Sequence, residues 1–368
     1  MPQPEPRRIV LAGAGHATMV ALTALGTSPR GTTVTLVSRG DSAHYSGMVP
    51  GWIEGIYPTG AMSIPLAPFA ASRGVQLVSG EITGADAGAL FLADGRAIAY
   101  DTLVVNAGSE TRLPPPLDHP AVVPAKPFEA LMAGLEAQLA VAPSFAVVGG
   151  GVAGCEIALA VAARRPDAAV TLIERAPQLL AGHPPSFASA VRRALAGRGV
   201  VLRLGVSVSA LEAGALGVSA VKVGAERIAA ATVVAVTGPA PPAWLAATPF
   251  RRTVDGFLAV DAAMRSISHP HVLAVGDAAT RLDDPRPKAG VFSVRAGPPL
   301  AEALRRIAAG AEPAPVHLQR RALVLLATGE RRAIGTRNGV TLQGRWVWWL
   351  KDRLDRAFVE RLRDLPHA

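Results

Sequence analysis

Hydrophobic residues fall into short β-like runs, and helix-like stretches separate many of them. Apolar runs at 9–12 and 33–37 flank a stretch (17–25) whose apolar residues suit a buried helix. The same order recurs at 145–173, again with a glycine cluster directly after the first run. Continuous apolar strands that alternate with helices are typical of a buried parallel sheet. The pattern therefore predicts an α/β fold built from strand–helix–strand units.

Two of these units repeat one another in register. The first reads "RIVLAGAGHATMVALTAL" and then "TTVTLVSRG", and the second reads "FAVVGGGVAGCEIALAVA" and then "AAVTLIERA". Gly13 precedes Ser38 by 25 residues, and Gly149 precedes Glu174 by the same 25. Matched spacing indicates two copies of the strand–glycine turn–helix–strand unit that binds dinucleotides. It argues against a secretory signal in the first copy and a membrane span in the second.

The second copy carries a complete fingerprint. Its glycines permit a tight turn, a close approach of backbone to pyrophosphate, and close packing of helix on strand. Glu174 is suited to accept hydrogen bonds from a ribose, which favours NAD(H), although the neighbouring Arg175 leaves NADP(H) open. The predicted NAD(H) contacts are Gly149, Gly150, Gly151, Val152, Ala153, Gly154, Glu174 and Gly238.

The first copy is degenerate. Thr18 stands at the position of the third glycine, and Ser38-Arg39 stands where the second copy has Glu174-Arg175. We therefore expect a ribose held by Ser38 or by backbone, with Arg39 near adenine or phosphate.

Later strands also end in turns of small residues. "YDTLVVNAGSETR" (100–112) and "AATVVAVTGPAP" (230–241) each end this way, and "HPHVLAVGDAAT" (269–280) ends in Gly-Asp. Gly276 permits a close approach of backbone to a ligand, and Asp277 is suited to accept a hydrogen bond from a polyol. The alternative for Asp277 is a plain helix N-cap.

Composition narrows the function classes. The chain has 368 residues, enough for two domains, and a net charge of +9 that comes almost entirely from Arg. Such a charge suits anionic ligands, an anionic membrane surface or nucleic acid, but the basic run and aromatic ladder of a nucleic-acid groove are missing. The single cysteine, Cys155, excludes an intrachain disulfide, a Cys-rich zinc site and a dithiol relay. It favours an intracellular, cytoplasmic protein.

In this order the motifs resemble the two-dinucleotide-binding-domain flavoproteins of the pyridine nucleotide:disulfide oxidoreductase superfamily. Four segments resemble one subgroup more narrowly: "HYSGMVPGWIEGIY", "RPKAGVFSVRAGPPLAEALRR", "LLATGERRAIGTRNG" and "GRWVWWLKDRLDRAFVERL". That subgroup stands alone or is fused to selenide, water dikinase, and is related to type II NADH:quinone and sulfide:quinone reductases. The resemblance implies two Rossmann-like domains: an FAD domain (1–118 and 250–318) interrupted by an NAD(H) domain (119–249), and then a C-terminal module (319–368).

The resemblance also implies the FAD contacts. Residues 41–55, "DSAHYSGMVPGWIEG", are expected against the flavin, with Trp52 as a wall of the pocket. Disulfide reductases carry a cysteine pair at this place and this chain carries none, so electrons are expected to leave the flavin directly. For His16 a capping role is an equal alternative. The implied FAD residues are Gly13, Ala14, Gly15, His16, Ala17, Ser38, Arg39, Tyr45, Ser46, Val49, Pro50, Ala107, Gly108, Gly276, Asp277 and Ala278.

Two residues are candidates for catalysis. Glu156 resembles a carboxylate that related flavoproteins place between nicotinamide and flavin, where it would steer the nicotinamide or relay a proton. The alternative is a helix residue paired with an Arg. Lys288 lies where the family borders flavin and acceptor, and a cation there favours the anionic reduced form. Cys155 is better explained by packing than by redox work.

The C-terminal segment predicts an amphipathic helix. Val347, Leu350, Leu354, Phe358 and Leu362 share a face at spacings of three and four, with Asp and Arg expected opposite. Three of the five Trp residues lie between 346 and 349. A basic amphipathic helix led by Trp suits a bilayer interface, so contact of residues 344–368 with the inner face of the cell membrane is one expectation, while the alternating charges favour the alternative. The alternative is a helix that packs on the body or across a homodimer.

We therefore expect an FAD-dependent NADH oxidoreductase that passes electrons to a small quinone-like acceptor, with no nucleic acid as partner. Two alternatives stay open. One is a selenium-linked reductase that works with selenide, water dikinase, and the other is a flavin- or NAD-binding sensor with little turnover.

Overall fold

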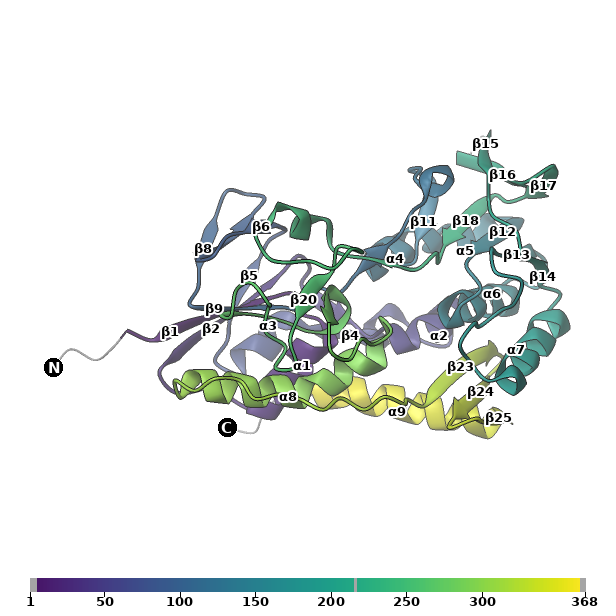
Figure 1. The fold of residues 1–368 in the computed structure, drawn as a ribbon. Coiled ribbons are helices and arrows are strands. Elements are labelled where there is room, and N and C mark those ends of the chain that lie inside the picture. The colour runs from purple at the N-terminus through teal and green to yellow at the C-terminus, as the bar shows by residue number, and fades with distance from the viewer. Residues whose placement is uncertain (1–4, 215–216, 365–368) are drawn as a thin grey trace.

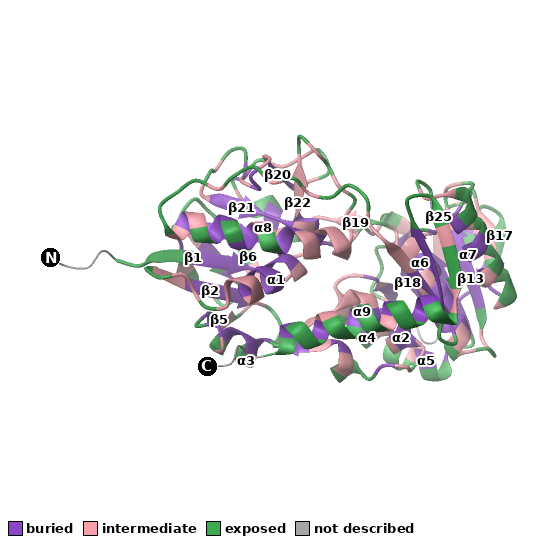
Figure 2. Cartoon of the chain, turned by 90° about the horizontal axis from the view of Figure 1, so that it is seen from below, coloured by how far each residue is buried: buried purple, intermediate pink, exposed green. Residues whose placement is uncertain are grey.

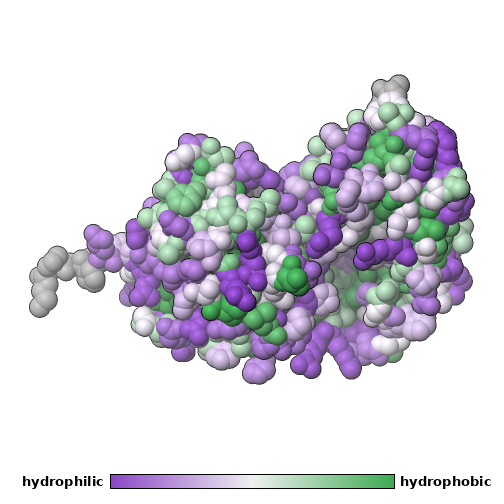
Figure 3. Space-filling model, turned by 45° about the horizontal axis from the view of Figure 1, so that its top comes forward, coloured by the Kyte–Doolittle hydropathy of each residue, from purple (hydrophilic) through white to green (hydrophobic). Residues whose placement is uncertain are grey.

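The fold is that of a computed structural model, which describes residues 5–214 and 217–364. Residues 1–4 of the predicted FAD domain, 215–216 of the predicted NAD(H) domain and 365–368 of the predicted C-terminal module lie outside the described residues. The rest forms two lobes with a notch between them (Figure 3).

The first lobe is built on a parallel five-stranded sheet, in the order β21-β9-β1-β2-β5. Residues 9–12 pair with 34–37 on one side and with 102–105 on the other. The far later strand β21 joins the edge beside β9, so the chain leaves this lobe and returns to it. Helices α1 and α8 pack closely, since a Cβ on Gly297 would lie 2.4 Å from Val20 Cγ1. The elements are β1 (Arg7–Ala12), α1 (His16–Leu25), β2 (Thr32–Ser38), α3 (Leu66–Ala71), β5 (Gln76–Ser79), β9 (Thr102–Val105), β20 (Leu258–Val260), β21 (Val272–Ala274), β22 (Ala279–Arg281) and α8 (Gly290–Ala308).

The second lobe repeats this plan, with a parallel sheet in the order β11-β18-β12-β13-β14. Strand β12 is buried along its whole length, as a central parallel strand should be, and β1 and β13 are drawn largely in the buried colour in Figure 2. Both sheets confirm the predicted α/β class with Rossmann-like units. The elements are β11 (Val122–Pro124), α4 (Phe128–Glu136), α5 (Gln138–Val141), β12 (Ser144–Val148), α6 (Val152–Arg164), β13 (Ala169–Glu174), α7 (Pro185–Gly197), β14 (Val201–Leu204) and β18 (Thr232–Ala235).

Each lobe carries a small antiparallel sheet beside its parallel sheet. Two further short strands lie where the chain crosses between the lobes. β10 (Glu110–Thr111) pairs with β19 (Pro239–Ala240), which ties the two crossings of the chain to each other. The decorating strands are β6 (Ile82–Ala85), β7 (Ala89–Leu92) and β8 (Ala97–Ala99) on the first lobe, and β15 (Ala210–Gly214), β16 (Gly217–Val223) and β17 (Glu226–Ala229) on the second.

The C-terminal module bridges the lobes. Its antiparallel sheet packs on α6 and α7 of the second lobe, and its helix α9 returns to the first lobe, against β4 (Ser63–Pro65) and α1. Figure 1 shows these parts in yellow and yellow-green beneath both lobes. The strands are β23 (Val324–Gly329), β24 (Arg332–Arg337) and β25 (Val340–Gly344), and α9 spans Arg345–Arg363.

Helix α9 is present as predicted, but the expected division into an apolar and a charged face is wrong. Lys351 and Asp355 are buried, with 8% and 6% of their surface exposed. Leu350 and Leu354, expected on the apolar face, are 39% and 48% exposed. Periodicity counts apolar side chains and does not recognise an i,i+4 Lys–Asp pair that neutralises itself inside the fold.

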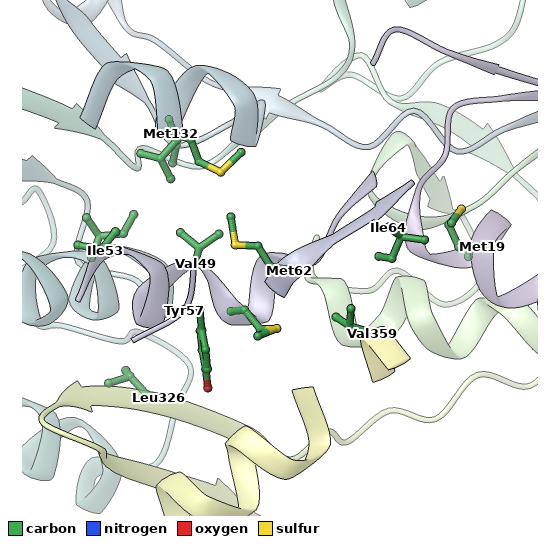
Figure 4. Packing of buried hydrophobic residues seen from close by; sticks show 14 of the residues in the cluster. Met19, Val49, Ile53, Tyr57, Met62, Ile64, Met132, Leu326 and Val359 are labelled. Carbon is green, nitrogen blue, oxygen red and sulfur yellow. The ribbon is translucent and has the colours of Figure 1, made fainter. Parts of the chain in front are cut away.

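One hydrophobic core joins the two lobes and the module. Val49 and Ile53 of α2 (Val49–Ile53) lie in the same buried cluster as Met132 of α4 and Leu326 of β23 (Figure 4). Val359 of α9 belongs to it as well. The segment expected against the flavin is therefore a shared packing element of all three parts.

Candidate functional site

The first glycine turn lies against the carboxyl ends of β9 and β21. A Cβ on Gly13, which has a φ of +103°, would lie 2.6 Å from Ala107 Cα, so only glycine permits this approach. Asn106 joins the parts: its Nδ2 donates to Val275 O (3.0 Å) and its Oδ1 accepts from Thr18 N (2.9 Å). The turn (13–17), Ala107-Gly108 and the Gly-Asp turn (276–278) are thus brought together as predicted. Sequence reasoning missed Asn106, whose partners lie far away along the chain.

This turn has the properties of a phosphate cradle. Helix α1 begins after Gly15, which offers no side-chain cap, and it has no acid in its first turn. Asn106 accepts from the N–H of Thr18, which leaves the N–H groups of His16 and Ala17 for an anion. Thr18 Oγ1 is buried without a hydrogen-bond partner within the described part of the chain. A Cβ on Gly108 would meet nothing within 4 Å. Ser38 and Arg39 lie at the carboxyl end of β2, where Arg39 is exposed. An anionic dinucleotide such as FAD fits this donor set.

Asp277 is buried in the 3-10 turn Gly276–Ala278 and makes an ion pair that the sequence did not predict. Lys126 Nζ donates to Asp277 Oδ2 at 2.5 Å and to Ser109 Oγ at 2.9 Å. Ser109 Oγ lies 3.2 Å from the same Asp277 oxygen. Lys126 follows β11 of the second lobe, in the Pro-rich stretch 113–127 that pattern analysis treated only as a linker. Its rarity as one of four lysines was the only available signal.

Residues 41–55 form β3 (Ser42–His44), a 3-10 turn (Ser46–Met48) and then α2. The Tyr45 ring lies 5.5 Å from the His16 ring and 4.6 Å from the Phe358 ring of α9. A Cβ on Gly290, at the start of α8, would lie 3.5 Å from both His16 Nδ1 and Ser46 Oγ. The predicted residues Tyr45, Ser46 and His16 therefore meet at one place, the N-terminus of α8.

Other predicted members of this group are less central. Val49 and Pro50 are buried, and the Trp52 indole donates to Thr59 Oγ1 at 3.2 Å, which turns its polar edge outward. Burial lowers the pKa of His16 to about 4, so its ring is neutral near pH 7.

Lys288 lines a cavity of about 50 Å³ together with Asp277 and Ser293. Its Nζ donates to Ala279 O and to Thr280 Oγ1, and it lies 4.2 Å from the centre of the Phe257 ring. Burial lowers the pKa of Lys288 to about 8, although Asp277 opposes this shift. The amine is thus held by the first lobe itself.

The second glycine turn has the geometry of an intact dinucleotide site. Gly149 has a φ of +122° and comes so close to Val236 O that a Cβ would lie 2.3 Å from it. Glu174 Oε2 accepts from Gly150 N at 2.5 Å and its Oε1 accepts from Ala176 N at 2.7 Å. Open space surrounds Gly151 and Gly238, while Gly154 packs on Gly149 O and Val152 and Ala153 open α6. The predicted NAD(H) residues therefore surround one turn.

Cys155 is a packed thiol. It is fully buried and its Sγ lies 3.7 Å from Gly150 O. Burial raises the pKa of the Cys155 thiol to about 12, so the reactive thiolate is scarce at neutral pH.

Two glutamates, one in α6 and one directly after α2, accept hydrogen bonds from backbone N–H groups in β23 and directly after it. Glu156 Oε1 accepts from Ala327 N at 2.8 Å, and Glu54 Oε2 accepts from Glu330 N at 3.1 Å. Burial raises the pKa of each to about 7, and Lys351 acts in the opposite direction on both. The predicted alternative of an Arg partner for Glu156 is not what the structure contains.

Lys351 links the module to the segment 41–55, which is expected against the flavin. Its Nζ donates to Gly47 O at 2.5 Å and to Asp355 Oδ2 at 2.7 Å. Burial opposes its charge, but Asp355 and Glu156 outweigh burial and raise the pKa of Lys351. The Tyr57 hydroxyl donates to Asp352, the residue directly after Lys351. A buried charged cluster from α9, α2 and α6 thus adjoins Tyr45.

Curated relatives match part of the chain. A family model described as "Pyridine nucleotide-disulphide oxidoreductase" matches residues 7–300. A "Nitric oxide reductase FlRd-NAD(+) reductase" of Citrobacter koseri is 32% identical over 184 residues, which are 49% of this chain and 47% of that protein. The chain therefore spans about half the length of the curated relatives it matches.

Solved structures share the fold over nearly the whole chain. "NDH2 from plasmodium falciparum in complex with NADH" has a TM-score of 0.81, 11% identity and 97% coverage of both chains. The sulfide:quinone oxidoreductase of Aquifex aeolicus has a TM-score of 0.80, 17% identity and coverage of 97% of this chain and 91% of its own. A ferredoxin reductase of Rhodopseudomonas palustris has a TM-score of 0.77, 20% identity and coverage of 89% and 81%.

The two glutamates predict a pH-dependent stability. Because both carboxyls have pKa values near 7, above the ordinary 4.5, the folded protein binds more protons than the unfolded chain between these pH values. Stability should be highest below pH 4.5 for these groups and fall as pH rises to about 7. Glu54→Gln and Glu156→Gln should each gain about 1–2 kcal/mol over wild type at pH 8 relative to pH 5.

Chemical denaturation at both pH values measures this difference. Glu136→Gln, at an exposed position of α4, is the matched control and should show none. An equal effect of Glu156→Gln at pH 5 and pH 8 would contradict a buried carboxylate that ionises near neutrality.

Proposed function

The chain belongs to the pyridine nucleotide-disulphide oxidoreductase family, and we propose that it passes electrons from NADH through FAD directly to a small quinone-like acceptor. One observation carries the proposal of direct transfer. The segment 41–55 against the flavin-binding turn has no cysteine, and the single thiol, Cys155, is buried with a raised pKa. A dithiol relay within this chain therefore has no residues to use.

FAD and NAD(H) are the cofactors, and the chain's residues bind and orient them. Bound FAD takes up two electrons from NADH and delivers them to an acceptor. We assign the phosphates of FAD to the N-terminus of α1 and its polyol to Asp277. The turn at Gly149–Gly154 receives the pyrophosphate of NADH, and Glu174 receives the adenosine ribose. Lys288, beside Asp277, adds a positive charge at this end of the site.

Glu156 is the proposed proton carrier. Its Oε1 is occupied by Ala327 N, and its pKa of about 7 allows it to bind and release a proton at neutral pH. Lys351 and Asp355 lie beside it, and their charges hold the cluster in place. A two-electron reduction of a quinone consumes two protons, which makes such a carrier useful.

The choice of a quinone-like acceptor is supported by similar structures that cover the chain through its C-terminal module. NDH2 and a sulfide:quinone oxidoreductase each match 97% of this chain. The second of these is named for its quinone acceptor, which supports a quinone-like acceptor here. The second candidate acceptor is a small redox protein. Two similarities favour it: the 32% identity to an FlRd-NAD(+) reductase, and a fold shared with a solved covalent complex of putidaredoxin reductase and putidaredoxin (TM-score 0.76, 21% identity). A selenium compound, the third, follows only from the subgroup resemblance.

Helix α9 also supports a peripheral place on a membrane. Trp346 and Trp349 are 56% and 67% exposed, and they share one side of α9 with the exposed Leu350 and Leu354. Arg353, which lies on the same side, suits anionic headgroups. Across residues 5–214 and 217–364, no helix is long and apolar enough to cross a membrane.

Rapid mixing with NADH without oxygen tests the proposed reductase. NADH should bleach the yellow flavin absorbance within the turnover time, and a soluble quinone should restore it. Flavin that stays oxidised in NADH would contradict the proposal. Reoxidation by a ferredoxin-type protein or a selenium compound, but not by quinone, would transfer the assignment to those acceptors.

Vesicle flotation tests the membrane proposal. Trp346→Ser with Trp349→Ser should lower binding to vesicles rich in anionic lipid by at least about tenfold, because two interfacial Trp side chains are lost. Trp244→Ser, on the first lobe, is the control for loss of an indole elsewhere. Equal flotation of both variants, or binding that does not depend on anionic lipid, would contradict it.

A further inference from the structure

Lys126 lies where the second lobe touches the proposed FAD site. Its backbone is tied to the first crossing of the chain: Lys126 N donates to Thr111 Oγ1 (2.7 Å), and Thr111 N donates to Lys126 O (3.3 Å). Its side chain then reaches into the first lobe, to Ser109 and Asp277. The backbone of Lys126 is therefore held at the crossing into the second lobe, and its amine is held in the first lobe.

The positive charge of Lys126 compensates the negative charge of Asp277. The side chain of Asp277 is 10% exposed, and a buried carboxylate without a counter-charge is costly. Lys126 Nζ is the cation at ion-pair distance from it within the described ranges. Lys288 is also near, but its amine donates to Ala279 O and Thr280 Oγ1.

The contacts from Lys126 and Ser109 both reach the same oxygen of the Asp277 carboxylate. Both Lys126 and Ser109 bind Oδ2 of Asp277, so their pull on the carboxylate comes from one side. That leaves Oδ1 as the oxygen for a hydroxyl of the cofactor.

We propose that Lys126 is a positioning residue for FAD, which holds the Asp277 carboxylate by its Oδ2 so that Oδ1 faces the cofactor polyol. Retention of FAD then depends on a residue that the NAD(H)-binding lobe supplies, so the two lobes are coupled through the cofactor. The proposal rests on the placement of FAD at Asp277 and is independent of which acceptor is reduced.

Titration of apoprotein with FAD, followed by flavin fluorescence, tests it. Lys126→Met should raise the dissociation constant of FAD by roughly tenfold or more, and Lys126→Arg should restore most of the affinity. Asp277→Asn should also weaken binding. The double variant Lys126→Met/Asp277→Asn should bind no worse than Asp277→Asn alone, because Lys126 acts through Asp277. Lys222→Met, at an exposed lysine of β16, should change nothing.

The outcomes separate the inference from the site assignment. Additive losses in the double variant, an unchanged Lys126→Met, or an Arg variant as weak as Met would each overturn the role of Lys126. Full FAD affinity in Asp277→Asn would overturn the placement of FAD and this proposal with it. If Lys126→Met does not fold, as circular dichroism of the apoprotein would show, the Arg variant and the double variant still decide. In the double variant the unpaired buried charge is gone.

Discussion

The buried amine of Lys351 determines how the C-terminal module sits on the protein. An ammonium group inside a fold must be paired and hydrogen-bonded, and here Asp355 supplies the charge and Gly47 O the further acceptor. Gly47 belongs to the turn that leads into α2, so this contact fixes α9 against the segment 41–55. The same contact turns Trp349 and Leu350 outward to solvent.

The carboxylates around this contact follow from the same arrangement. Strand β23 is an edge strand, and the N–H of Ala327 within it and the N–H of Glu330 directly after it need acceptors. Glu156 and Glu54 provide them from α6 and α2, which places two carboxyls with raised pKa values beside Lys351. A protein with this cluster has proton-exchanging groups next to the proposed flavin site without any thiol.

The glycine turns and parallel sheets were predictable because their signals are local. Gly13 and Gly149 permit backbone contacts that no other residue allows, and their spacing to the next strand is visible in the sequence. Asn106 and Lys126 were not predictable, since their partners are far away along the chain. Asn106 directly precedes the predicted contacts Ala107 and Gly108, but its side-chain partners are not visible in that motif. The buried side of α9 was predicted wrongly because hydrophobic periodicity contains no information on the hydrogen bond from Lys351 to Gly47 O.

In the proposed reaction, electrons pass directly from the flavin to the acceptor without a thiol. The measurement is the steady-state reduction of a water-soluble quinone by NADH, with equal FAD content, in wild type and in Cys155→Ala. Because the thiol packs in α6 and has no part in the reaction, the two rates should agree within about twofold. A loss of tenfold or more in a variant that stays folded and loaded with FAD would contradict the account, since electrons would then depend on Cys155.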